Sequence, residues 1–134
     1  MVKTAAALII IGIMSSAGTR LSAHHSFAAE FDSTKPITLR GTVTKIERTN
    51  PHGWIYLDVK EASGAVNNWA VETNAPAALA RRGVTKESLS IGTEVKIEGF
   101  RAKDGSRMVN GTTLTLPDGR DFPVGSPTAD SPYK

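Results

Sequence analysis

The sequence predicts an all-β protein with one short helix, most simply a small five-stranded barrel of the OB-fold type. Five segments alternate apolar and polar residues with the period of a half-buried strand. Short turns join them, and one helix-like segment separates the third strand from the fourth. This order matches the OB-fold, a Greek-key barrel. A small β-sandwich or an open sheet is the alternative.

The first 23 residues are typical of a secretory signal peptide. An initial positive charge is followed by the apolar run 5–14 and then by small residues. That run is shorter than the roughly 20 residues that a membrane-spanning helix needs. Cleavage after Ala23 would make His24 the first residue, whereas cleavage after Ala17 or a retained membrane anchor are alternatives. We therefore expect a periplasmic or secreted bacterial protein whose mature form has no transmembrane span.

The mature chain divides into three parts by composition. Residues 24–36 show little periodicity and end at a proline, so we expect an extended N-terminal arm. Residues 37–123 carry the strand patterns and form the barrel domain. Residues 124–134 are rich in glycine, proline, serine and aspartate, which predicts a disordered tail.

The first half of the domain predicts a meander of three antiparallel strands. The first strand begins at Ile37, and its alternation changes parity between Val43 and Ile46, which predicts a bulge or sharp bend. The second strand covers 54–60 and the third covers 66–73. A turn signal rich in glycine, proline or asparagine precedes each of these two strands.

In the second half, the alternation typical of a strand first gives way to a helix-like segment. Asn74 is a suitable N-cap, Pro76 suits the first turn of a helix, and Gly83 ends it. Residues 93–101 and 108–116 alternate again and predict the last two strands.

Composition excludes several classes of protein. Loss of Lys3 and Arg20 with the signal peptide leaves 14 of the 16 basic residues against 13 acidic ones, a net charge of +1. This balance gives no reason to expect a nucleic-acid partner. Without cysteine there is no disulfide, thiolate metal site or thiol nucleophile. Phosphate-binding and nucleophile motifs are also missing. We therefore expect a binding protein, and an enzyme only if a redox metal supplies the chemistry.

The histidines are the candidate metal ligands. As the first residue, His24 would offer both its amine and its ring, and His25 or His52 would add a second imidazole. Amine and imidazole nitrogens suit Cu(II), so copper or another divalent ion is the expected ligand. Zinc is less favoured, because structural zinc sites usually close four ligands and cysteine is absent. Glu30 and Asp32 are candidates for an oxygen ligand or for orienting a ring.

A metal-free function is the alternative. Trp54, Tyr56 and Trp69 are candidates for one aromatic face of the sheet, where OB-like barrels stack ligands. Such a face would bind a sugar, a peptide or another small partner in the cell envelope. A third hypothesis is a copper-dependent oxidoreductase.

Several segments together resemble a family of small exported bacterial proteins that is known only as a domain of unknown function. The resemblance implies a periplasmic or secreted setting and no established activity. The family signature matches His24, His25 and His52, but Arg48 stands where the resemblance leads us to expect tryptophan. The matching strings are HHSFAAEFD (24–32), GTV-x-KIE-x-TNPHGWIYLDV (41–59), NWAVE (68–72), LARRG (79–83) and IGTEVKIEGFRAKDGS (91–106).

A terminal histidine also resembles the copper sites of periplasmic copper-resistance carriers and of lytic polysaccharide monooxygenases. This second likeness is confined to His24 and is an analogy between single sites.

Overall fold

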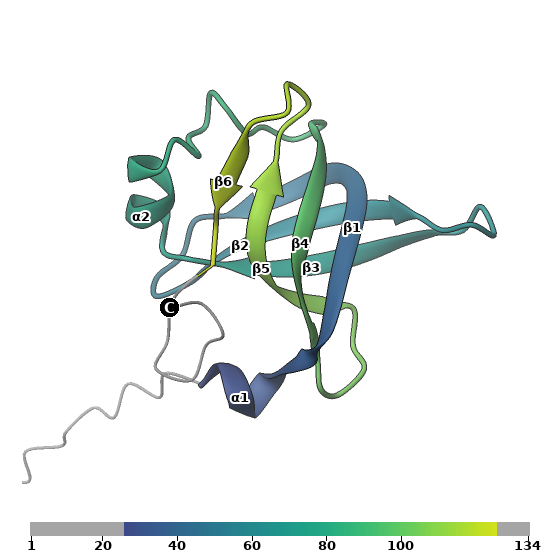
Figure 1. Cartoon of the computed structure of the whole chain (residues 1–134). Coiled ribbons are helices and arrows are strands. Elements are labelled where there is room, and N and C mark those ends of the chain that lie inside the picture. Colours follow the sequence, from purple (N-terminus) through teal and green to yellow (C-terminus); the bar gives the residue numbers. More distant parts are fainter. Residues whose placement is uncertain (1–25, 126–134) are drawn as a thin grey trace, which may run out of the picture.

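The computed structural model describes residues 26–125, so the predicted signal peptide, His24 and His25 lie outside the described residues. Six strands form one sheet, with a short helix before β1 and another between β3 and β4 (Figure 1). The elements are α1 (Phe27–Glu30), β1 (Phe31–Glu47), β2 (Gly53–Lys60), β3 (Val66–Thr73), α2 (Pro76–Arg81), β4 (Glu94–Ala102), β5 (Met108–Thr115) and β6 (Asp121–Pro123).

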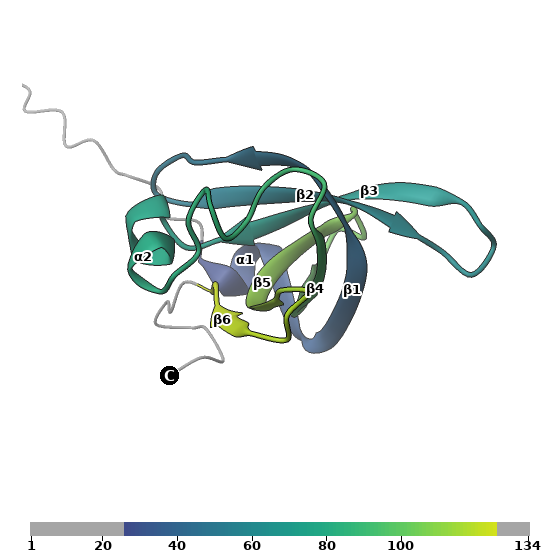
Figure 2. The same ribbon diagram turned by 90° about the horizontal axis from the view of Figure 1, so that it is seen from above.

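Five of the strands close into a ring. β1 pairs with β2 and β4, β2 with β3, and β4 with β5, all antiparallel, while a parallel pairing of β3 with β5 closes the ring. β6 adds to the other edge of β5. The hairpin of β2 and β3 extends beyond the ring in the view from above (Figure 2). The predicted all-β class with an OB-like order and a helix between the third and fourth strands is confirmed.

A bulge in β1 confirms the change of parity seen in the sequence. Val43 lies opposite Leu57, but the register then shifts, so that Ile46 lies opposite Ile55. One extra residue on β1 therefore turns both Val43 and Ile46 towards the barrel interior. Because the bulge also bends the strand, β1 can pair with β2 at one end and with β4 at the other.

The inward faces of the ring and the cover formed by α2 make the core. Without disulfides the domain depends on this apolar burial for its stability. The alternation predicted for β2 is confirmed, because Ile55 and Leu57 are inside while Trp54, Tyr56 and Asp58 face outward. Fully buried residues come from every strand of the ring and include Val43, Ile55, Leu57, Val71, Ile97, Val109 and Leu114.

The N-terminal arm differs from the expectation that it is extended. Four residues form the helical turn α1, and β1 begins at Phe31, six residues before the predicted start at Ile37. Phe27 and Phe31 are four positions apart and their rings lie 5.7 Å from each other. They form a second apolar cluster, separate from the main core, with Ala102, Phe100 and Met108. The arm is therefore packed against β4 and β5.

The end of the described chain is also part of the fold. Val124 is fully buried. Its N–H donates to the Thr112 carbonyl at 2.8 Å, and its own carbonyl accepts the Asn74 N–H at 2.7 Å. The prediction that disorder begins at Val124 is therefore wrong for this residue. Asn74 is not the N-cap of α2 either, because Ala75 occupies that position.

Candidate functional site

His52 lies in the tight turn between β1 and β2, directly before β2 begins. The Thr49 hydroxyl donates to the His52 carbonyl at 2.8 Å, which closes the turn. The His52 side chain is 23% exposed, and its Nδ1 lies 3.4 Å from Oε1 of Glu72. His52 is thus held at the start of β2 with one ring nitrogen against a carboxylate.

The register of β2 and β3 explains why Glu72 is there. Trp54 lies opposite Glu72, so Glu72 lies on the outer face only one residue pair away from the turn that carries His52. Glu72 is 8% exposed and is thus a buried carboxylate, a kind of group that proteins bury only with compensating partners. The sequence analysis missed Glu72. The predicted strands 54–60 and 66–73, paired across their short turn, would have placed it opposite Trp54.

Asn110 on β5 is a third polar residue beside His52 and Glu72, across the parallel strand pairing that closes the ring. In the parallel pairing of β3 and β5, Asn110 lies opposite Glu72, so the two side chains share the outer face. Asn110 is 6% exposed. We refer to these three residues as the His52–Glu72–Asn110 cluster.

Two polar atoms of the cluster are buried without a hydrogen bond. Within residues 26–125, neither Nδ1 of His52 nor Oδ1 of Asn110 has a hydrogen-bond partner. Leaving such atoms unsatisfied costs about 1–3 kcal/mol each, so most buried polar atoms in native proteins are paired. The cluster therefore presents a buried amide oxygen and a buried ring nitrogen beside a carboxylate, which is an arrangement suited to a cation.

The N-terminal arm is packed next to this cluster. Phe100 lies opposite Asn110 in the pairing of β4 and β5. The rings of Phe27 and Phe100 lie 5.8 Å apart, edge to face. Met108 precedes Asn110 by two residues on the same face and packs against the same apolar cluster. The described chain begins at Ser26, and α1 lies near the ends of β4 and β5 that their connecting turn joins (Figure 1).

Asp32, one of the two carboxylates predicted to assist the histidines, has local partners. Asp32 accepts hydrogen bonds from the Thr34 N–H and hydroxyl at 2.9 and 2.6 Å, and lies 3.4 Å from the Lys35 ammonium. The Thr34 hydroxyl chiefly holds the pKa of Asp32 below its usual range. The Glu30 carbonyl accepts the backbone N–H of Lys103 at 2.9 Å.

The described residues do not complete a metal site by themselves. Within residues 26–125, no three histidine, aspartate or glutamate side chains gather closely enough to hold an ion. Any further ligand for the pair formed by His52 and Glu72 would have to come from outside these residues.

The predicted aromatic face is divided between two sides of the sheet. Trp54 and Tyr56 are half-buried on the outer face, but Trp69 is 7% exposed and belongs to the core. The reason is the register, which places Trp69 opposite the buried Leu57. The prediction that all three aromatic residues share a ligand-binding face is therefore wrong for Trp69.

Tyr56 is also occupied by its neighbours on β1. Its hydroxyl donates to Glu47 at 3.1 Å, and the Lys45 ammonium lies 5.1 Å from its ring centre. Burial raises the pKa of Tyr56, whereas the Lys45 ammonium chiefly lowers the pKa of Glu47. Trp54, also half-buried, has no such contact among residues 26–125 and is thus the less engaged candidate for stacking on this face.

These features define a class of protein: a small all-β barrel with an OB-like strand order and a buried polar cluster beside its N-terminal arm. The chain belongs to a family of unknown function, DUF6152, whose model matches residues 12–112. The resemblance to an uncharacterised family is confirmed. No curated protein matches the chain. No helix within residues 26–125 has the length and apolar character needed to cross a membrane.

Proposed function

We propose that this is an exported, periplasmic or secreted protein that binds a divalent metal ion through His24 as its mature first residue. Copper is the metal ion that this proposal favours. The supporting observation is the His52–Glu72–Asn110 cluster, with two buried polar atoms that lack hydrogen bonds within the described residues. His52 supplies the second imidazole in this proposal. His25 remains the alternative, since it would form a local chelate that needs no fold.

The side chains of the cluster are of the kinds that bind Cu(II). A buried carboxylate makes the cluster favourable for a cation, and imidazole and amine nitrogens suit Cu(II). Nδ1 of His52 would bind the ion, and Glu72, whose Oε1 lies beside that nitrogen, would act as an oxygen ligand. Oδ1 of Asn110 would accept a hydrogen bond from an amine or ring N–H of the terminal residue. Both unsatisfied atoms would then have partners.

The length of the arm is compatible with this proposal. His24 precedes the buried anchor Phe27 by three residues, which span at most about 10 Å. Met108, which contacts the same anchor cluster, is two residues from Asn110, or about 7 Å along β5. From Asn110 to Glu72 is one strand spacing, about 5 Å. The terminus can therefore reach Asn110 while Phe27 stays packed, and the lengths of the His24 and Glu72 side chains would have to span the remaining distance.

A Cu(II) titration of the purified mature protein tests the proposal. Electron paramagnetic resonance is expected to show one equivalent of Cu(II) with nitrogen coupling. Replacing the imidazole in His52→Ala is expected to weaken binding about 10- to 100-fold, with no comparable effect from His25→Ala. The reverse order of the two variants would assign the local chelate instead. Absence of a nitrogen-coupled signal at one equivalent would remove the metal hypothesis.

Phe27→Ala tests whether the packed arm contributes to the site. Phe27 is 6% exposed and anchors α1, so its loss should release the arm while the three histidines remain. We expect Cu(II) affinity to fall about tenfold, because the terminal ligands are no longer held near His52. Isothermal titration calorimetry measures this change. Ala29→Gly, at an exposed position of the same helical turn, is the matched control. Unchanged affinity in Phe27→Ala would contradict a role for the arm.

A metal-free binding module is the second candidate, and the position of Trp54 favours it. Trp54 is half-buried on the outer face of β2, opposite Glu72. This is the face on which OB-folds bind oligosaccharides and oligonucleotides. A protein that takes up no Cu(II) but whose Trp54 fluorescence changes with an added sugar or peptide would favour this second function.

A further inference from the structure

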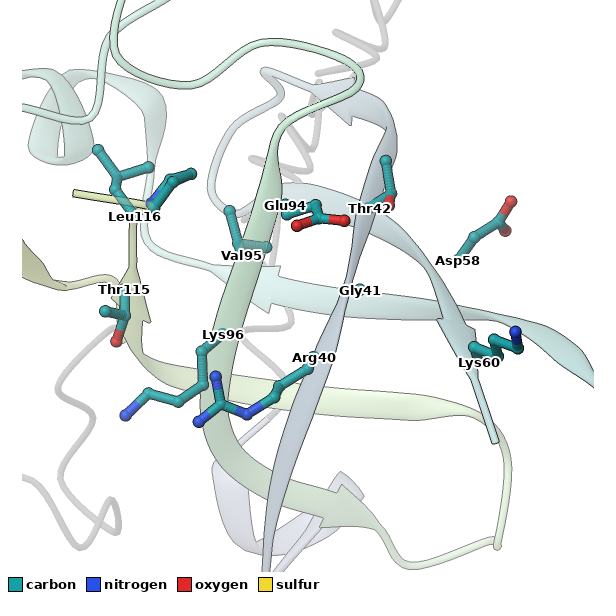
Figure 3. Close-up of a pocket in the computed structure, with 11 residues that line it drawn as sticks. Arg40, Gly41, Thr42, Asp58, Lys60, Glu94, Val95, Lys96, Thr115 and Leu116 are labelled. Carbon is teal, nitrogen blue, oxygen red and sulfur yellow. The ribbon is translucent and has the colours of Figure 1, made fainter. Parts of the chain in front are cut away.

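A second polar site lies on a different part of the barrel surface. A groove of about 600 Å³ crosses the outer faces of β1, β2 and β4 (Figure 3). We refer to it as the β1–β4 groove, and none of its lining residues belongs to the His52–Glu72–Asn110 cluster. Its volume is in the range of small-ligand sites. The charged and hydroxyl side chains that line it are Arg40, Thr42, Asp58, Lys60, Glu94, Lys96 and Thr115.

Strand register sorts these charges into two rows. Arg40 lies directly opposite Lys96, which gives a row of two cations, while Lys60 follows Asp58 by two residues on β2 and extends away from them (Figure 3). Thr42 lies opposite both Asp58 and Glu94, which gives an acidic row. Residues two apart on a strand are separated by about 7 Å. The groove therefore carries a cationic row and an acidic row side by side. The two rows are separated by about 7 Å, a distance similar to the size of one sugar ring.

The fold balances the cationic row only in part. Like charges directly opposite each other in an antiparallel pair are destabilising. Lys96 has an ion-pair partner in Glu98 at 2.8 Å. Arg40 and Lys60 have no ion pair among residues 26–125. Figure 3 shows the charged ends of Arg40 and Lys96 extending in the same direction. An oxyanion placed between them would relieve the repulsion, and the planar Arg40 guanidinium can bind it with two parallel hydrogen bonds.

The acidic row requires that the ligand also carry hydrogen-bond donors. Asp58 accepts a hydrogen bond from Asn68 at 2.9 Å through Oδ1, and Glu94 is exposed at the groove. Ionised carboxylates only accept hydrogen bonds, so they require donors from the ligand. Hydroxyl groups on a sugar ring are such donors.

We propose that the β1–β4 groove binds an acidic saccharide. Arg40 and Lys96 hold its oxyanion, with Lys60 nearby, and Asp58 and Glu94 accept hydrogen bonds from its hydroxyl groups. The oxyanion is either the carboxylate of a uronic acid or the phosphate of a sugar phosphate, and both share this chemistry. The proposal does not depend on metal binding.

Titration of the full mature chain with defined saccharides tests it. Amide chemical shifts in nuclear magnetic resonance would be followed with trigalacturonate, with glucose 6-phosphate and with the neutral galactotriose. We expect at least one of the acidic ligands to bind about tenfold more tightly than galactotriose and to shift the amides of β1 and β4. The tighter of the two acidic ligands identifies the oxyanion. Equal binding of the neutral sugar, or no binding of either acidic ligand, would overturn the proposal.

Charge-neutralising variants locate the site. Arg40→Gln and Lys96→Gln are each expected to weaken binding about tenfold. Lys86→Gln removes the same charge at an exposed position outside the groove and should leave binding unchanged. Arg40→Gln relieves the repulsion with Lys96, so its midpoint of urea unfolding should not fall, which separates lost binding from lost folding. Equal weakening by Lys86→Gln would show only general charge attraction and would contradict the site.

Discussion

Selective acetylation of the terminal amine of His24 is expected to weaken Cu(II) binding by the mature protein at least about 100-fold. In the proposed site, the terminal amine and the ring of the same residue chelate one ion. Acetylation turns the amine into an amide, which is a poor ligand while it keeps its proton, and it leaves every side chain unchanged. The measurement is a competition titration against a chelator of known affinity, with electron paramagnetic resonance to record the nitrogen coupling.

The matched control is the same acetylation of the double variant His24→Ala/His25→Ala, in which no imidazole adjoins the terminal amine. Acetylation should change the Cu(II) affinity of this variant far less. Equal affinity of the acetylated and unmodified mature proteins would refute a site that depends on the terminal amine. Mass spectrometry of the exported product supplies the premise, since it determines whether the mature chain begins at His24.

Gly99→Ala is expected to cost about 3 kcal/mol of unfolding free energy or more, the upper end of overpacking effects. A Cβ on Gly99 would lie 2.2 Å from the backbone oxygen of Asn110 and 2.6 Å from Cγ1 of Val109. Neither the backbone nor a fully buried valine can move aside easily. Gly99 lies opposite Gly111 at the point where the register of β4 and β5 shifts, so the substitution would push the two strands apart there.

Urea unfolding followed by circular dichroism measures the effect, and Gly119→Ala is the informative control. Gly119 has a φ of 87° and open space around its missing Cβ, so alanine there costs only backbone strain, about 1–2 kcal/mol. Gly99 is not among the positive-φ glycines, so its cost would be steric. If Gly99→Ala were no more destabilising than Gly119→Ala, the close approach of β4 to Asn110 would not constrain the barrel.

Local sequence patterns were sufficient for most of the strands. The third strand was predicted at 66–73 and is found at Val66–Thr73, because alternation and the flanking turns both depend on neighbouring residues. The β1 bulge was predictable for the same reason, since the parity of Val43 and Ile46 conflicts within four positions. β6 was not predicted, because three residues carry too little alternation to reveal a strand that exists only through its pairing with β5.

The candidate site was predicted only in part. His52 is predicted because histidine is rare in this chain. Glu30 and Asp32 are predicted from their closeness in sequence to the terminal histidines, but the Asp32 carboxylate pairs with Thr34 and Lys35. The carboxylate that faces His52 is Glu72, which reaches it through strand pairing.

By itself, the sequence determined the all-β class, the order of the strands around one helix and the presence of histidines suited to a metal. These follow from the period, the turns and the residue types, which are local properties. Only the tertiary structure decided that Glu72 and Asn110 lie side by side and that Phe27 packs against the strand leading to them. The physical reason is the parallel pairing of β3 with β5, which closes the ring between residues that no local pattern connects.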